Sequence, residues 1–389
     1  MERGNVLVIG NSGVGKSTLV NAVLGQELAK TGGGTTDKLE LYQPENEEVP
    51  FRIIDTIGFQ PGLFRQRAIQ AVKQWSRECT RKGKEGTQVN VIWFCIDGTS
   101  RKLFPETIKH FAKIASIWSS VPVIAVITKS YSTPQREQNI QMVYDAFSSQ
   151  KKQGANLHRV IPVVAAPYVL DENTFVAPEG IAELIDATNS LMPEGVQFSQ
   201  KDLSKFILNR KRVFAQGVVA AATAAGAAVG AIPIPFSDAM LLTPTEVAEI
   251  NAIAKIYGIG KNENSKRLLN SIIEVGTVSA AAKTLISTLK AIPGLNLGAS
   301  VLNAVIAGVI IAGLGEGSIY AFEQIYLGNK STQDIDWIRK LLTARLSLTI
   351  VEKAKPILSN LKGTSDKKAV LKAVLELLAT VVGKSEDHT

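Results

Sequence analysis

The stretch from Asn5 to Leu24 reads NVLVIGNSGVGKSTLVNAVL, and it decides the fold of the first part of the chain. Its centre, Gly10–Ser17 (GNSGVGKS), matches the phosphate-loop pattern G-x-x-x-x-G-K-[ST]. An apolar run precedes this loop and a helical pattern, Thr18–Leu24, follows it, which is the context that the motif requires. Glycines let backbone N–H groups surround a phosphate, and the new helix directs its positive end at the same anion. The stretch therefore predicts a phosphate-binding site rather than a chance glycine-rich turn.

We expect the whole loop to contact a nucleotide. Lys16 is expected to reach the β- and γ-phosphates and to act in catalysis, and the hydroxyl of Ser17 is expected to bind Mg²⁺. The predicted nucleotide-binding residues of this segment are Gly10, Asn11, Ser12, Gly13, Val14, Gly15, Lys16, Ser17 and Thr18.

The composition indicates a chain with room for two domains. It has 389 residues, 45% of them hydrophobic, and only two cysteines, so neither a disulfide framework nor a zinc site is expected. A reducing compartment follows, and we expect a cytoplasmic protein. The phosphate loop starts at residue 10, which leaves no room for a signal peptide. The net charge is +1 in residues 1–198 and +7 in residues 199–389, which indicates an anionic partner, such as a membrane or RNA, or a solvated basic surface without one.

Residues 1–195 alternate apolar runs with amphipathic segments, as in an α/β domain. This pattern predicts a mostly parallel sheet with helices on both faces, and ligands bind such sheets at the carboxyl ends of the strands. The expected strands are Val6–Ile9, Phe51–Ile54, Val89–Ile96, Val121–Ile127 and Val160–Val164, with Lys38–Tyr42 at the edge; the expected helices include Phe64–Arg81, Glu106–Ile117, Gln135–Gln150 and Pro178–Leu191.

Residues 196–389 predict an Ala-rich, all-helical domain. Val213–Phe236 is 24 residues long without a charge, and Ala291–Gly315 is 25 residues long without a charge. These lengths suffice to span a bilayer, but Ala and Gly contribute little to insertion. Two interpretations stay open, a buried soluble core and a conditional or stable membrane segment. Amphipathic helices are expected around these stretches, at Pro244–Tyr257, Asp334–Asn360 and Asp366–Val382.

A second nucleotide motif, D-x-x-G, follows the strand Phe51–Ile54. Here Asp55 would hold Mg²⁺ through water, and the N–H of Gly58 would sense the γ-phosphate. The glycine-rich segment between the two motifs carries Thr35 and Thr36, of which Thr36 is favoured as a hydroxyl ligand of Mg²⁺. An ordinary flexible loop is the alternative for this segment.

Together the phosphate loop, Gly34–Asp37 (GTTD) and Asp55–Gly58 (DTIG) resemble the Era, EngA and septin-like group of GTPases. The resemblance implies GTP or GDP and Mg²⁺ as ligands. Ala231–Asp238 (AIPIPFSD) followed by Ile250–Ile259 (INAIAKIYGI) resembles an Ala-rich C-terminal domain of uncharacterised function found on some Era-like GTPases, whose relatives are often membrane-associated. The overall plan is also similar to the immunity-related and dynamin-like GTPases.

The base-recognition motif of that group, [NT]-K-x-D, is incomplete in this chain. Thr128 and Lys129 fit the pattern, but Tyr131 replaces the aspartate that accepts hydrogen bonds from guanine. Ser130 or Ser132 can offer a weaker acceptor. Ala165 and Ala166 resemble the S-A-K turn of the group by position, without its Ser and Lys. Guanine selectivity is therefore expected to be reduced or to be met differently.

The catalytic glutamine of classical small GTPases is also absent, since Phe59 follows Gly58. Gln60 is the remaining candidate for positioning water, and slow intrinsic hydrolysis is expected. A partner, a nucleotide-dependent second copy of the chain or potassium would then supply charge stabilisation. Arg65 and Arg67 are either arginine fingers or ordinary surface residues.

Three functions remain open at this point. The leading one is a GTP-hydrolysing switch whose helical domain responds to the nucleotide, including contact with an anionic membrane. The second is a ribosome- or RNA-associated GTPase, against which residues 199–389 show no basic run interleaved with aromatics. The third is a structural module that binds nucleotide with little hydrolysis.

Overall fold

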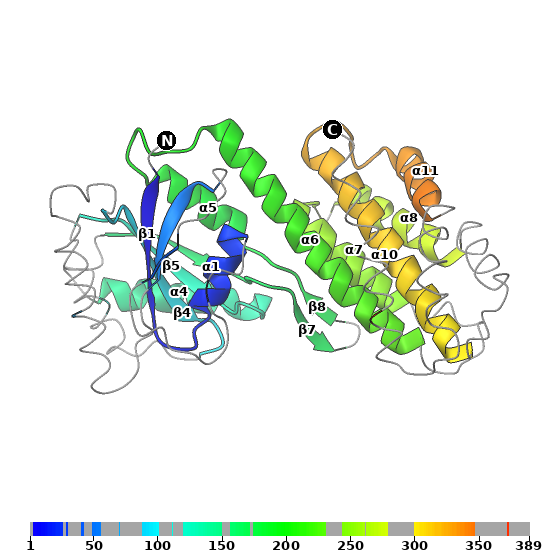
Figure 1. Ribbon diagram of the computed structural model, residues 1–389, viewed down its shortest axis with the longest axis horizontal. Coiled ribbons are helices and arrows are strands. Elements are labelled where there is room, and N and C mark those ends of the chain that lie inside the picture. Colours follow the sequence, from blue (N-terminus) through cyan, green and yellow to red (C-terminus); the bar gives the residue numbers. More distant parts are fainter. Residues whose placement is uncertain are drawn as a thin grey trace. The chain divides into compact units, whose positions relative to one another are not determined.

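The computed structural model describes residues 3–25, 29, 40–42, 49–55, 70, 88–100, 111, 120–149, 156–171, 174–230, 243–260, 262–278, 299–346 and 372. The chain divides into two compact units, Met1–Ala166 with Pro178–Arg210, and Pro167–Ala177 with Lys211–Thr389. Figure 1 shows a sheet with helices in the first unit and a group of helices in the second. The two units are described separately below.

The first unit contains a six-stranded sheet in the order β2-β3-β1-β4-β5-β6. All neighbours pair in parallel except β2, which pairs antiparallel with β3 at one edge. This topology confirms the predicted mostly parallel sheet and the predicted edge strand. The strands are β1 Gly4–Gly10, β2 Glu40–Tyr42, β3 Phe51–Asp55, β4 Val91–Asp97, β5 Val123–Thr128 and β6 Leu157–Pro162.

The described helices of the first unit include three that lie wholly within it. They are α1 Lys16–Leu24, α4 Thr133–Ser148 and α5 Ile181–Ser190, and each agrees with a predicted helix to within a few residues. Pro134 stands in the first turn of α4, where its missing N–H has no intrahelical acceptor in any case. The helices predicted at Phe64–Arg81 and Glu106–Ile117 lie outside the described residues, apart from Gln70 and Phe111.

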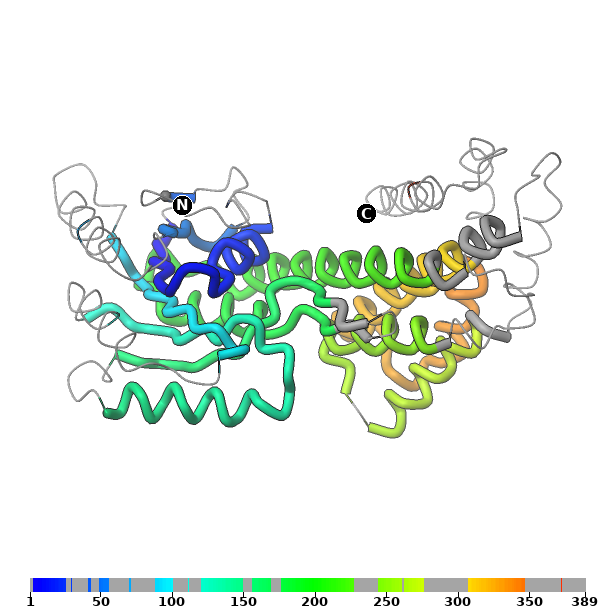
Figure 2. The backbone as a smooth tube through the Cα atoms, turned by 90° about the horizontal axis from the view of Figure 1, so that it is seen from below, coloured from blue at the N-terminus to red at the C-terminus, as the bar shows by residue number. Residues whose placement is uncertain are grey.

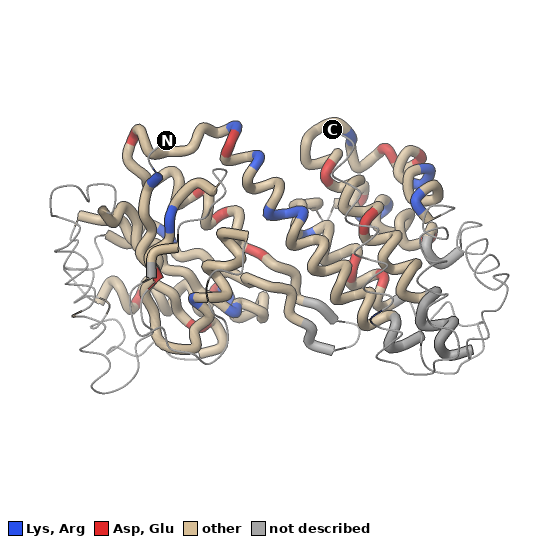
Figure 3. The backbone as a smooth tube through the Cα atoms, viewed as in Figure 1, with Lys and Arg blue, Asp and Glu red and all other residues tan. Residues whose placement is uncertain are grey.

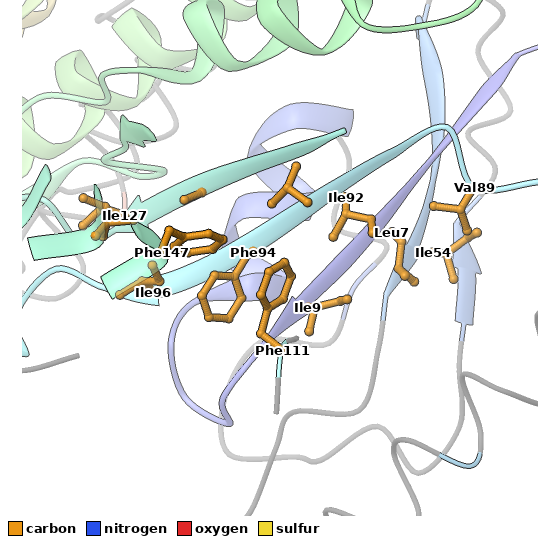
Figure 4. Packing of buried hydrophobic residues seen from close by; sticks show 13 residues of the cluster. Leu7, Ile9, Ile54, Val89, Ile92, Phe94, Ile96, Phe111, Ile127 and Phe147 are labelled. Carbon is orange, nitrogen blue, oxygen red and sulfur yellow. The ribbon is translucent and has the colours of Figure 1, made fainter. Parts of the chain in front are cut away.

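A phenylalanine cluster packs on one face of the sheet (Figure 4). The rings of Phe94 on β4 and Phe111 stack with centroids 4.2 Å apart, and Phe147 of α4 lies 5.6 Å from Phe111. Successive side chains of a strand point to opposite faces, so Trp93 lies on the other side of β4. There its indole N–H donates a 2.9 Å hydrogen bond to the hydroxyl of Thr188 on α5. Both faces of β4 are therefore covered, which explains its continuous apolar sequence.

The second unit is mostly helical, as predicted, with one small hairpin that the sequence did not predict. The hairpin consists of β7 Tyr168–Asp171 and β8 Thr174–Val176, paired antiparallel. The described helices are α7 Thr243–Tyr257, α8 Glu263–Val278, α10 Ala299–Tyr326 and α11 Ile335–Leu346. Helix α10 packs against α7, α8 and α11, and β8 packs against α7. The predicted helix Asp366–Val382 lies outside the described residues, apart from Lys372.

Helix α6, Gln200–Gly230, is one continuous helix and is drawn in green in Figure 2. Its charged residues lie in its first half, and the half that follows Arg212 is uncharged (Figure 3). Gly226 allows a close approach to α10, because a Cβ there would lie 2.0 Å from Cδ1 of Ile311. Among the described helices, none combines the length and apolarity needed to cross a membrane.

Candidate functional site

The phosphate loop lies at the carboxyl end of β1, between that strand and α1. Gly13 and Gly15 have φ angles of 78° and 95°, in the left-handed region that favours glycine. Gly10 is required for a different reason, since a Cβ there would lie 2.6 Å from the carbonyl oxygen of Cys95 on β4. The three glycines of the motif thus shape the loop through backbone conformation and through close packing on the neighbouring strand.

Lys16 is the ionisable group at the centre of the loop. Its side chain is buried, with the residue 7% exposed, and its Nζ donates hydrogen bonds to the carbonyl oxygens of Gly10 (3.2 Å) and Asn11 (3.1 Å). Burial lowers the pKa of Lys16, while the nearby carboxylate of Asp55 acts in the opposite direction. A desolvated ammonium held by loop carbonyls gains stability when an anion binds beside it.

Asp55 and Ser17 are the described candidates for holding a metal ion. Asp55 ends β3, which pairs with β1 so that Asp55 lies opposite Val8, and its residue is 1% exposed. Ser17 lies in the first turn of α1. A carboxylate and a hydroxyl are hard oxygen donors, which is the ligand chemistry that Mg²⁺ prefers. The donor set therefore fits Mg²⁺, with Thr36 outside the described residues.

Thr128 and Lys129 bind the phosphate loop from the end of β5. The hydroxyl of Thr128 lies within hydrogen-bond distance of the carbonyl oxygens of Val14 and Ile96. Lys129 has a φ of 52°, and among the described non-glycine residues no other has a positive φ. Its Nζ donates to the carbonyl oxygen of Gly13 (2.7 Å) and to Asp97 (2.8 Å). The T-K pair therefore holds the loop in place before any base is bound.

Asp97, at the end of β4, is a residue whose part in the site the sequence did not reveal. A turn follows it in the chain. Its carboxylate also binds Lys129 and accepts hydrogen bonds from the N–H (2.9 Å) and hydroxyl (2.6 Å) of Thr99. Burial raises the pKa of Asp97, but the hydrogen bonds from Lys129 and Thr99 outweigh it and leave this pKa below its usual value. The sequence could have indicated Asp97 through its position, because adjacent parallel strands end at the same edge of a sheet and Lys129 follows the next strand.

The segment after Lys129 is fixed by Arg136, whose part was likewise not predicted. The Arg136 guanidinium donates two hydrogen bonds, of 3.0 and 2.8 Å, to the carbonyl oxygen of Ser130 and pairs with Glu179. The hydroxyl of Ser130 is buried and donates to the carbonyl oxygen of Ile127 at 2.8 Å. The structure thus directs the Ser130 side chain into the protein, whereas Ser132 is exposed.

The remaining predicted site residues divide into two groups. Ala165 and Ala166 follow a bridge between Val164 and Glu179 beyond the end of β6, and Ala166 is exposed. Glu179 pairs with the backbone of Val164 and forms an ion pair with Arg136. The Ala165–Ala166 segment therefore lies next to the loop that Arg136 holds. The second group lies outside the described residues and comprises Thr35, Thr36, Gly58, Phe59, Gln60, Arg65 and Arg67.

A mostly parallel sheet with a phosphate loop after β1, an aspartate at the end of β3 and a T-K turn after β5 is the arrangement of phosphate-loop nucleotide-binding domains. Residues 5–129 match the family model described as 50S ribosome-binding GTPase, and residues 198–347 match the model described as Domain of unknown function (DUF697). Both matches confirm the resemblances inferred from the sequence, a GTPase domain followed by the uncharacterised Ala-rich helical domain.

Individual relatives match shorter parts of the chain. GTPase Der of Neisseria meningitidis serogroup B (strain ATCC BAA-335 / MC58) is 40% identical over 88 residues, which are 22% of this chain and 17% of Der. GTPase Era of Thermotoga petrophila is 23% identical over 213 residues, or 52% of this chain and 60% of Era. Toc33 from Arabidopsis thaliana superposes with a TM-score of 0.39 and 16% identity, covering 49% of this chain and 84% of Toc33. The chain spans less than a fifth of the length of this Der relative.

Proposed function

We propose that this protein binds guanine nucleotide with Mg²⁺ and hydrolyses GTP as a molecular switch. The observation that carries the proposal is the buried ammonium of Lys16, held by two loop carbonyls beside the carboxylate of Asp55. Backbone N–H groups, the N-terminus of α1 and Lys16 together offer positive charge to the β- and γ-phosphates. The match of residues 5–129 to a GTPase family and the names of the Der and Era relatives support guanine nucleotide as the ligand.

Ser17 and Asp55, with Thr36, would hold the magnesium ion. When bound, Mg²⁺ would neutralise charge on the phosphates and orient them. Within the chain, Lys16 stabilises negative charge on the transferred phosphoryl group and the N–H of Gly58 reports its presence. Gln60 positions water. Phe59 at the adjacent position orients no water, so slow intrinsic hydrolysis follows unless a second copy or another partner contributes charge.

Base binding is assigned to the loops after β5 and β6. The proposed residues are Thr128, Lys129, Ser130, Ala165 and Ala166. The described contacts support a positioning part for three of them, because Thr128 and Lys129 bind the phosphate loop and Ser130 is held through its carbonyl by Arg136. With Tyr131 at the usual aspartate position, guanine is held without a carboxylate.

Titration of the full chain with fluorescent GDP tests nucleotide binding. We expect the protein to bind fluorescent GDP and ATP to displace it only weakly. EDTA should weaken the binding of a GTP analogue. Lys16→Ala should reduce the affinity for nucleotide at least about tenfold, since a charge-assisted hydrogen bond contributes about 1.5–3 kcal/mol. Lys266→Ala, which removes an exposed lysine of α8, is the matched control. Equal affinity of wild type and Lys16→Ala would refute the proposal.

The second part of the proposal is that the helical domain, residues 196–389, responds to the nucleotide. In this proposal the protein is cytoplasmic, and its response includes contact with an anionic membrane. Its net charge of +7 over residues 199–389 supports such a contact. Flotation with anionic liposomes in GDP and in a non-hydrolysable GTP analogue tests it. Flotation with the analogue alone supports a nucleotide-gated contact, and no flotation in either state excludes it.

A ribosome- or RNA-associated GTPase is the alternative, and the description of the matching family as ribosome-binding favours it. Its basic second half would then contact phosphates, so binding would weaken steeply with salt. Co-sedimentation with ribosomal particles between low and high salt separates this alternative from membrane binding.

A further inference from the structure

Helices α7 and α10 bury three carboxyl groups inside the second unit. Glu246 and Glu249 are three residues apart on α7, so their side chains share one side of that helix. Glu316 lies on α10, which packs against α7. Glu249 is 0% exposed, Glu246 1% and Glu316 7%. Glutamate is almost never fully buried unless it is paired, so three together require an explanation.

Four of the six oxygens of these carboxyl groups lack a hydrogen-bond partner among the described residues. Within the part of the chain that the structure describes, no hydrogen-bond partner reaches either oxygen of Glu249, Oε2 of Glu246 or Oε1 of Glu316. The Glu249 carboxyl also packs directly on the backbone of α10, because a Cβ on Gly315 would lie 2.3 Å from its Oε1. An ionised carboxylate in such a place loses its hydration without gaining a partner.

The surrounding charges do not compensate Glu249. The charged groups that act on it are the other two carboxyls, Glu246 and Glu316, and both favour its neutral form. Arg212 of α6 and Arg345 of α11 act on Glu316, but Arg212 already pairs with Glu323 and Arg345 lies over the ring of Tyr320. Burial raises the pKa of the nearby Tyr257 phenol, on which the charges of Glu323, Arg212 and Glu316 also act. β8 carries no charged residue, and the charged residues of α8 are exposed: Glu263, Lys266, Arg267 and Glu274.

A metal ion does not account for the cluster. Among the described residues, no group of three or more His, Cys, Asp or Glu side chains is arranged to hold one. As far as the described residues go, the remaining way to keep these groups in an apolar core is to protonate them.

We propose that Glu246, Glu249 and Glu316 form a proton-dependent switch in the helical unit. While they are protonated, α7 packs tightly on α10. Ionisation drives these two helices apart, because separation returns the carboxylates to water. The switch is a property of the second unit and operates without nucleotide.

Neutral pH lies within the range of the switch. Burial raises the pKa of Glu246 and of Glu316 to about 7, and burial together with the two neighbouring carboxyls raises the pKa of Glu249 well above its usual value. A folded-state pKa above the unfolded value gives stability that is fully present below the unfolded value and is lost as the pH rises through the folded one. One carboxyl shifted from 4.5 to about 7 changes the unfolding equilibrium constant by about 70-fold between pH 5 and pH 8.

Hydrogen exchange of the full chain between pH 5.5 and 8 tests the switch, after correction for intrinsic exchange rates. We expect protection of α7 and α10 to fall by at least about tenfold over this range, while β1, β4 and β5 change little. Glu249→Gln, which keeps the shape and cannot ionise, should raise protection at pH 8 and remove much of the pH dependence.

Glu274→Gln on the exposed face of α8 is the matched control and should leave the pH dependence unchanged. If Glu249→Gln does not fold, Glu316→Gln serves as the test with the same expectation. Protection of α7 that is constant from pH 5.5 to 8 in the wild type would overturn the proposal. An equal loss of protection at both ends of the range in Glu249→Gln would overturn it as well, since it would show a fixed structural role.

Discussion

Replacing Tyr131 by Asp is expected to strengthen the guanine preference of the nucleotide site. The turn that carries residue 131 is already fixed in place, because the N–H of Tyr131 donates to the carbonyl oxygen of Lys129 at 2.8 Å and Nζ of Lys129 binds Gly13 at 2.7 Å. We expect a carboxylate introduced on this turn to meet the two guanine donors by side-chain rotation. Little further ordering of the loop is required.

The size of the effect follows from the number of hydrogen bonds. A hydrogen bond to a charged group contributes about 1.5–3 kcal/mol, and Tyr131 is half-buried, so we take the lower value for each of the two bonds. The variant should therefore bind GTP about 100-fold more tightly than the wild type, since each ~1.4 kcal/mol is a factor of about ten. Inosine triphosphate lacks the N2 amino group and should gain about tenfold. ATP should gain nothing.

Competition titrations against a fluorescent nucleotide measure all three affinities. Ser132→Asp is the matched control, because it adds the same charge one residue further on, at the exposed start of α4. A general electrostatic effect would appear in both variants and would act on all three nucleotides alike. The reasoning is wrong if Tyr131→Asp leaves GTP affinity unchanged while the protein stays folded, or if GTP and ATP gain equally.

Three further predictions concern the first unit. Gly25→Ala should lower the free energy of unfolding of this unit by about 2–4 kcal/mol in urea unfolding. The reason is that the φ angle of Gly25 is 74° and the new Cβ would lie 1.8 Å from the buried Arg210 guanidinium. A loss under about 1 kcal/mol would show that Arg210 moves freely. Lys129→Met should weaken nucleotide binding at least about tenfold in titrations, through the lost bond to Gly13, and unchanged affinity would contradict this. Asp97→Asn should lower the free energy of unfolding near pH 6, and this difference from the wild type should vanish as the pH falls through the depressed pKa of Asp97. Unfolding experiments from pH 6 to 2.5 measure the difference. A difference that persists at the lowest pH would count against an ionic role.

The sheet and the phosphate loop could be predicted because their signals are local. β1 and α1 flank a motif whose glycines are dictated by φ angles within one loop. The β7–β8 hairpin escaped prediction since its strands, Tyr168–Asp171 (YVLD) and Thr174–Val176 (TFV), are short and each contains a polar residue, so neither forms a continuous apolar run. The start of α6 lies within the region predicted to be helical, but its position was not predicted, because Lys201–Arg212 is rich in charge and only the uncharged part after it stood out. Tertiary packing can order a segment whose own pattern is weak.

The parts of the site that the sequence did not reveal depend on pairs of elements. Asp97 matters because β4 and β5 end at one edge, where its carboxylate meets Lys129. Arg136 matters because the start of α4 lies beside the loop that precedes this helix, where its guanidinium reaches the carbonyl oxygen of Ser130. The Asp97 contact depends on the register of the folded sheet, and the Arg136 contact depends on how α4 starts after β5. A motif search finds the residues that touch a ligand more readily than those that position them.

Lys16 and Glu249 show the same physical rule with opposite outcomes. Each is an ionisable group removed from water, and for each the largest effect on its pKa is burial. Lys16 keeps two carbonyl acceptors and an acidic neighbour, so its charge persists in a place open to an anion. Among the described residues, Glu249 has neither a hydrogen-bond partner nor a cationic neighbour that acts on it, so its neutral, protonated form is favoured. The first unit is therefore expected to respond to phosphate and the second to pH, and a double perturbation of both groups should give additive effects unless the units communicate.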